Sequence, residues 1–165
     1  MEEPRKALAL VRIEKAEHCI ESANLMISSE FYLDAANRSY YAIFHAMRSV
    51  LALEAKDFSK HAGVISYFRK NYIKTGIFSI KHSRIIDDLF EVRSNSDYDD
   101  FFVIEKSEVL RQVEDAKFFV NSIKEYVESQ QVDWKGKRTA YAVLLFMFCK
   151  DVLMSYLMVK ITVFE

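Results

Sequence analysis

The stretch that decides the fold is Asn37-Arg38-Ser39-Tyr40-Tyr41-Ala42-Ile43-Phe44-His45-Ala46. Apolar residues recur in it at helical spacing and predict a helix over residues 34–55. Arg38 and His45 are seven residues apart, so they project from nearly the same face, about 10 Å apart along the axis. Tyr41 lies between them on that face. A cation, a phenol and an imidazole in one row are groups that bind a phosphate and move a proton.

The overall composition also predicts long helices. The chain has 165 residues, of which 51% are hydrophobic, but only three glycines and one proline. This length suits one domain with a real core, and the scarcity of turn-forming residues argues against a sandwich or barrel. The net charge is −1, so any contact with RNA must come from a local basic patch.

Neither a metal nor another cofactor is expected. Cys19 and Cys149 are too few and too far apart in the sequence for a disulfide framework or a zinc site. The clustered acidic residues lack the glycine and closing glutamate of a calcium loop. The first residues include acidic side chains and no apolar core, so we expect no secretion signal and a cytoplasmic location.

Helical periodicity continues through residues 1–130 and predicts an all-α antiparallel bundle. We expect breaks at Ser28-Ser29-Glu30 and at Ser94-Asn95-Ser96-Asp97, with Asp34 and Ser107 as N-caps of the helices that follow. Shorter helices are expected over residues 61–72 and 80–93. The expected buried faces are Leu8, Val11, Ala16, Cys19, Ala23 and Met26; Ala36, Tyr40, Ile43, Met47, Val50 and Leu51; Ile85, Ile86, Leu89 and Phe90; and Val109, Val113, Ala116, Val120, Ile123 and Val127.

Residues 131–165 form an apolar C-terminal extension of different character. Residues 140–159 have the length of a membrane span. Lys150 and Asp151 lie at its centre, and each costs about 2.5–3.5 kcal/mol there, so a membrane span is the less favoured interpretation. The alternatives are an extra helix or hairpin that covers the bundle or a partner, and a tail that is not native to the domain.

The residues around the decisive stretch resemble a known family. Residues 35–48 resemble the second-helix signature of small prokaryotic HEPN domains, and Phe31-Tyr32-Leu33-Asp34-Ala35 looks like the entry into that helix. Ser59-Lys60-His61-Ala62-Gly63-Val64 resembles the family's third segment. Arg93 with Asp97-Tyr98-Asp99 is similar to its late element. The resemblance covers roughly residues 8–128.

The resemblance implies a bundle of four to five helices that forms a homodimer. It also implies a separately encoded nucleotidyltransferase partner in a toxin–antitoxin-like system, and binding of RNA or a nucleotide. Many members are metal-independent endoribonucleases with four to six residues between an arginine and a following histidine, and Arg38 and His45 have six residues between them. In the ribonuclease toxins that motif lies late in the chain. Here residues 93–98 contain no histidine, which favours a binding module over a ribonuclease.

A ribonuclease built on these residues would use His45 as acid or base and Arg38 as the phosphate clamp. Tyr41 would orient the substrate, and Arg48 or Arg93 would add positive charge. The late pair Asp97 and Tyr98 completes the set of candidate substrate-binding residues.

Three hypotheses therefore stand. The first is a HEPN module that binds nucleotide, RNA or a protein partner, and the second is an endoribonuclease that uses Arg38 and His45. The third is a structural dimerisation domain, in which His45 is a hydrogen-bonded buried histidine and Arg38 pairs with Asp97. Burying an arginine and a histidine without a purpose is costly, which favours the first two.

Overall fold

The computed structural model describes residues 3–99 and 101–130, without the side chains of Asp97 and Tyr98. Within these residues the chain forms α-helices, one short π-helix and no strand, which confirms the predicted all-α bundle. The predicted extension, residues 131–165, lies outside the described residues. The helices are α1 (Glu3–Ser28), α2 (Tyr32–Leu53), α3 (His61–Phe68), the π-helix η1 (Arg69–Ile73), α4 (Ile80–Tyr98) and α5 (Lys106–Ser129).

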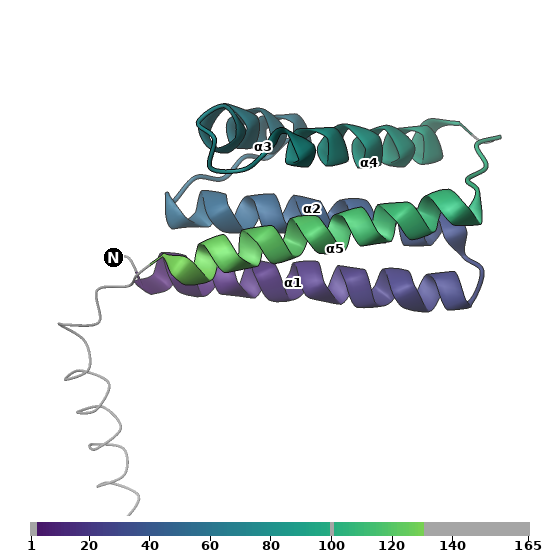
Figure 1. Cartoon of the computed structure of the whole chain (residues 1–165), viewed down its shortest axis with the longest axis horizontal. Coiled ribbons are helices and arrows are strands. Elements are labelled where there is room, and N and C mark those ends of the chain that lie inside the picture. The colour runs from purple at the N-terminus through teal and green to yellow at the C-terminus, as the bar shows by residue number, and fades with distance from the viewer. Residues whose placement is uncertain (1–2, 100, 131–165) are drawn as a thin grey trace, which may run out of the picture. The chain divides into compact units, whose positions relative to one another are not determined.

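Helix α2 is the centre of the bundle. It packs against α1, α3, α4 and α5 (Figure 1). Its apolar residues and several alanines and serines are buried, because neighbouring helices cover it on most sides. The expected face of this helix is confirmed, and so is that of α5. The buried residues of these faces are Ala36, Tyr40, Ile43, Met47, Val50 and Leu51 in α2, and Val109, Val113, Ala116, Val120, Ile123 and Val127 in α5.

The expected face of α1 is wrong in its first two turns. Leu8 and Val11 are each 46% exposed. The buried positions instead follow alternate steps of four and three residues, the spacing of a helix that packs closely along its partner. The helix has apolar side chains on two sides, and the smaller ones face the core because alanine lets the helices approach. These buried residues are Ala9, Ile13, Ala16, Ile20 and Ala23.

Several expected helix ends are also wrong. Residues 94–97 form no turn, because α4 runs on to Tyr98. Helix α2 begins at Tyr32, so Asp34 lies inside its first turn, where a carboxylate favours the helix dipole. Ser107 lies within α5, which follows Glu105 without a side-chain cap. Phe90, expected in the core, is 37% exposed.

The third expected helix changes its winding after Phe68, where α3 passes into η1. Tyr72 of this π-helix is buried, and its hydroxyl donates to Glu54, the residue that follows α2. Tyr67 of α3 donates to the other oxygen of the same carboxylate at 2.5 Å. Two phenols therefore donate hydrogen bonds to a carboxylate at the C-terminal end of α2, where the helix dipole disfavours a negative charge.

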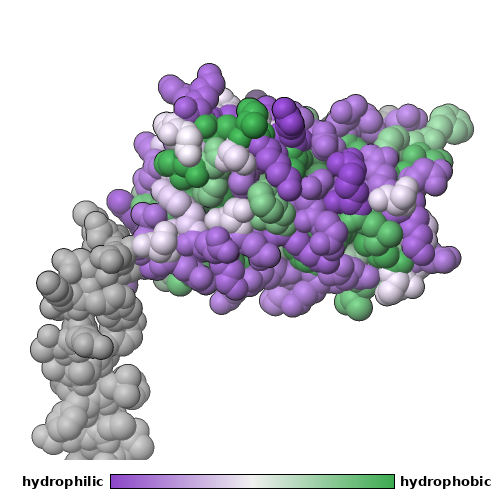
Figure 2. Space-filling view, viewed as in Figure 1, coloured by the Kyte–Doolittle hydropathy of each residue, from purple (hydrophilic) through white to green (hydrophobic). Residues whose placement is uncertain are grey.

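The surface is mostly hydrophilic on the face that Figure 2 shows, with hydrophobic patches toward the two ends of the bundle. Phe101 and Val103, just before α5, are the most exposed large apolar side chains of the described residues, at 92% and 83%. In the described part of the chain, no helix has the length and apolar character needed to cross a membrane.

The core predicts how single truncations change stability. Phe68 is fully buried and stacks against Phe78, with Phe119 also in ring contact. Replacing it (Phe68→Ala) should lower the free energy of unfolding by about 3–5 kcal/mol, because the cavity cannot be refilled. Phe101→Ala, at an exposed position, should change it by less than about 0.5 kcal/mol. Urea denaturation of both variants checks this, and equal effects would contradict the described packing.

Candidate functional site

One face of α2 stays open between the neighbouring helices. Between the first turn and Leu53, the partly exposed positions are Asn37, Arg38, Tyr41, His45 and Arg48, spaced as one stripe along the helix. We call Arg38, Tyr41, His45 and Arg48 the α2 row. The guanidinium of Arg38 lies over the ring of Tyr41, 5.2 Å from its centroid. The structure thus brings together the four residues that the sequence predicted on this helix.

Arg48 is held by a carboxylate that the sequence analysis missed. Asp57, in the loop after α2, accepts hydrogen bonds from Arg48 Nη2 at 2.6 Å and Nε at 3.1 Å. Arg12 of α1 donates to the same carboxylate at 2.7 Å and to the backbone carbonyl of Arg48 at 2.8 Å. Arg12 is only 9% exposed. Arg12 directly precedes the core residue Ile13. A charged side chain so close to the core needs a partner, so this position could have indicated the ion pair with Asp57.

These bonds have a clear electrostatic result for Asp57. Its hydrogen bonds with Arg48, the backbone N–H of Phe58 and Arg12 lower the pKa of the carboxyl from 3.8 to about 2. Asp57 is therefore charged at every physiological pH. One carboxylate fixes two guanidiniums and joins the loop to α1 and α2.

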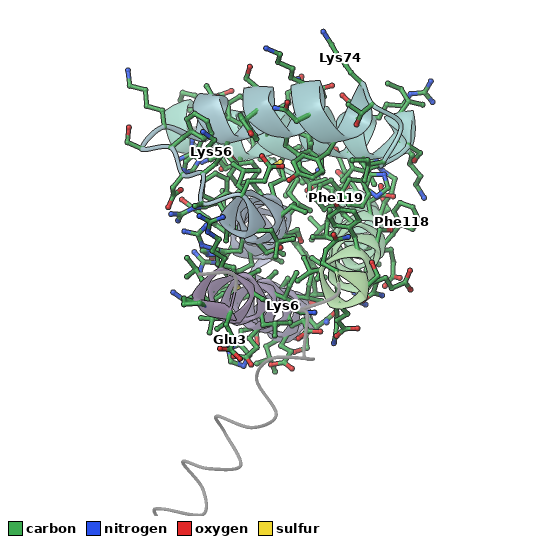
Figure 3. All side chains as sticks on the ribbon, turned by 90° about the vertical axis from the view of Figure 1, so that its left-hand side faces the viewer. Glu3, Lys6, Lys56, Lys74, Phe118 and Phe119 are labelled. Atoms are coloured by element: carbon green, nitrogen blue, oxygen red, sulfur yellow. The ribbon has the colours of Figure 1, made fainter. Side chains whose placement is uncertain are left out.

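His45 lies half-buried in the row, in a positive field. Burial is the largest cause that lowers the pKa of His45 below 6.5, and Arg48, Lys15, Arg12 and Arg38 lower it further. The imidazole is therefore mostly neutral at pH 7. No hydrogen bond joins its ring to another of the described residues, so the bonded, buried histidine of the structural hypothesis is not what the structure shows. Figure 3 shows the nitrogen atoms gathered along this edge of α1 and α2, near Lys56.

A second histidine stands beside the row, and the sequence analysis gave it no role in the site. His61, the first residue of α3, stacks on Phe44 with ring centroids 4.1 Å apart. Its Nδ1 lies 2.9 Å from the hydroxyl of Tyr40. Phe44 also contacts His45, at 6.1 Å between centroids. The motif Ser59-Lys60-His61 could have indicated this role, because it places a histidine at the start of a helix that packs against α2.

Two residues of the late part of α4, Arg93 and Ser96, contact α2 near the site. The guanidinium of Arg93 lies 6.0 Å from the ring centroid of Tyr40, on the buried side of α2. Ser96 donates a hydrogen bond to Oδ1 of Asn37 at 3.1 Å, which ties α4 to the start of the row. The side chains of Asp97 and Tyr98 lie outside the described residues, so their predicted roles stay predictions.

The arrangement is suited to binding an anion. Cationic side chains from two helices surround a neutral imidazole, and a phenol lies between them. Within residues 3–99 and 101–130, no three histidine, cysteine or acidic side chains gather as metal ligands. The α2 row itself offers imidazole, phenol and guanidinium groups.

Removing the Asp57 charge should make stability depend less on pH. A carboxyl with a lowered folded pKa stabilises the fold above its unfolded value of 3.8, and this stabilisation is lost as the pH falls through about 2. Asp57→Asn should lower the free energy of unfolding by only about 1 kcal/mol at pH 7, because the side chain is 46% exposed and solvent screens it. The difference should vanish near pH 2 in denaturation curves. Glu114→Gln, in a surface pair with Lys117, is the control and should change little. A difference that is constant with pH would contradict this account.

Comparison with known proteins identifies the family. The model of the HEPN domain matches residues 9–126. A protein of Methanocaldococcus jannaschii named "Putative toxin MJ0142" is 32% identical over 120 residues, which cover 73% of this chain and 82% of the relative. A UPF0332 protein of Thermotoga maritima is 30% identical over 128 residues, covering 78% of this chain and 96% of the relative. Together with the helical bundle, these matches show that the chain belongs to the HEPN domain family.

Proposed function

We propose that this HEPN module binds RNA, and that the α2 row holds the phosphate backbone. The observation that carries the proposal is the field at His45. Four cationic side chains from α1 and α2 lower its pKa, although Asp57 pairs with two of them, Arg12 and Arg48. The chain as a whole has a net charge of −1, so this positive region is local.

The row also suits RNA in its chemistry. Arg38 is partly exposed, and its guanidinium could contact a phosphate bidentately from its place over the ring of Tyr41. Tyr41 offers an aromatic face and a hydroxyl beside it. Single-stranded nucleic acid binds where cations follow the backbone and aromatic rings meet the bases. RNA is therefore a better fit to the row than an isolated inorganic anion.

The names of two relatives add a biological setting. Relatives from Methanocaldococcus jannaschii, 32% and 34% identical to this chain, carry the names "Putative toxin MJ0142" and "Putative toxin MJ0605". We extend this setting to the present chain and propose that it is the HEPN member of a toxin–antitoxin-like pair. In this proposal the module is a homodimer and its partner is a separately encoded nucleotidyltransferase, as the resemblance implies.

Loss of one row cation should weaken RNA binding. Arg38→Ala should raise the Kd for a fluorescent single-stranded RNA about tenfold at low salt, and the salt dependence of log Kd should become shallower by about one phosphate contact. Arg111→Ala on α5, where the arginine pairs with surface acids, is the matched control and should bind as the wild type does. Anisotropy measured with excess chelator gives both values. Light scattering on the same samples gives the mass, twice 19.3 kDa for a homodimer. Equal losses in both variants would contradict a role for the row.

Metal-independent cleavage of RNA is the second candidate function. It is favoured by one observation, the mostly neutral His45 between cations. A neutral imidazole can remove the proton of a ribose 2′-hydroxyl, which then attacks the adjacent phosphorus. Arg38 would stabilise the growing charge on the phosphate. The bond from phosphorus to the 5′-oxygen breaks and this oxygen takes a proton from solvent, so the products would be a 2′,3′-cyclic phosphate and a free 5′-hydroxyl.

Cleavage of this kind has a characteristic pH dependence. Because the pKa of His45 is lowered from 6.5, the basic form persists as the pH falls, and the cleavage rate should decline only at a midpoint below 6.5. His45→Ala should reduce the rate at least a hundredfold. Single-turnover rates on labelled RNA with chelator check both statements. A wild-type protein that binds RNA but leaves it intact would exclude cleavage and keep the binding proposal.

A further inference from the structure

The Tyr40–His61 pair is built into the site, but the proposed function leaves it without a role. Tyr40 is fully buried in α2, and its hydroxyl has one hydrogen-bond partner in the described residues, Nδ1 of His61 at 2.9 Å. Desolvation is the largest cause that raises the pKa of Tyr40, to about 12. The phenol therefore keeps its proton at neutral pH.

The direction of this hydrogen bond follows from burial. If Nδ1 of His61 carried a hydrogen and donated it, the hydroxyl hydrogen of Tyr40 would be left buried with no acceptor among the described side chains, which is unfavourable. The hydroxyl of Tyr40 therefore donates, and Nδ1 accepts. A neutral imidazole that accepts at Nδ1 carries its hydrogen on Nε2.

The surroundings of His61 keep it neutral. Burial is the largest cause that lowers the pKa of His61 below 6.5, and Arg93 and Arg48 lower it further. The rings of Phe44 and Tyr41 pack against it at centroid distances of 4.1 and 6.2 Å. The residue is only partly buried. It therefore combines one fixed tautomer with partial access to solvent.

We propose that the Tyr40–His61 pair supplies an uncharged N–H donor of fixed tautomer, Nε2–H of His61, to a phosphate oxygen of RNA bound on the α2 row. The inference rests on the proposed function and adds a residue outside the row to it. His61 and His45 contact the same ring, that of Phe44, which places His61 alongside the row. The two histidines then differ in role, because the ring of His61 has a fixed partner at Nδ1 and that of His45 has none among the described residues.

The test has a spectroscopic part and a binding part. In protein with ¹⁵N-labelled histidine, long-range ¹H–¹⁵N correlation at neutral pH should show His61 as the Nε2–H tautomer. Tyr40→Phe should turn this signal into a mixture of tautomers, since the fixed donor is lost. Addition of a single-stranded RNA oligonucleotide should shift the Nε2 resonance of the wild type. His61→Ala should weaken RNA binding about tenfold, and His61→Gln, whose amide N–H can replace Nε2–H, should recover most of it.

The outcomes separate the inference from the proposed function. An Nδ1–H tautomer in the wild type overturns the inference. So does an Nε2 resonance that RNA leaves unchanged while Arg38→Ala still weakens binding, and in that case the proposed function stands. Failure of the wild type to bind RNA overturns both. Equal loss in His61→Gln and His61→Ala, with the wild-type resonance unmoved by RNA, shows a structural role and also overturns the inference.

Discussion

Close packing around α2 is the constraint on which the rest of the structure depends. Four other helices contact it, so its buried positions carry small, apolar or aromatic residues. The row of Arg38, Tyr41, His45 and Arg48 lies where this cover is incomplete. The core and the candidate site therefore lie on different faces of the same helix. Packing of the core fixes the positions of the residues on the polar face.

The sequence predicted α2 and α5 well, because each has a single apolar stripe of helical period. In α1 it placed Ala16 and Ala23 correctly in the core, but Leu8 and Val11, also expected there, are exposed. It also ended α4 too early, since Ser94-Asn95-Ser96-Asp97 favours a turn when considered alone. The last turns of α4 include Ser96, whose hydroxyl donates a hydrogen bond to Asn37 of α2. Such a tertiary contact is not visible in the local sequence.

The site was predicted only where its residues lie on one helix. Spacing alone placed Arg38, Tyr41 and His45 on a common face. Arg12 bonds to Arg48 across 36 residues of sequence and to Asp57 across 45. Local periodicity contains no information about such pairings, which arise when α1 and the loop after α2 are packed together.

The charged residues of the site have two different electrostatic effects. Asp57 neutralises part of the field of Arg12 and Arg48, which allows two guanidiniums to stay close together. Arg38 and Lys15 add positive charge that reaches His45. The imidazole is thus deprotonated by its surroundings without direct contact with a base.

The bridge of Asp57 also bears on how fast a ligand can associate. Its bonds tie the segment between α2 and α3 to α1, so this edge of the site is already formed before a ligand arrives. Association then needs no loop to become ordered, and diffusion in the local positive field sets its rate. Such an encounter slows as ionic strength rises, while the rate of escape depends on the contacts made after docking.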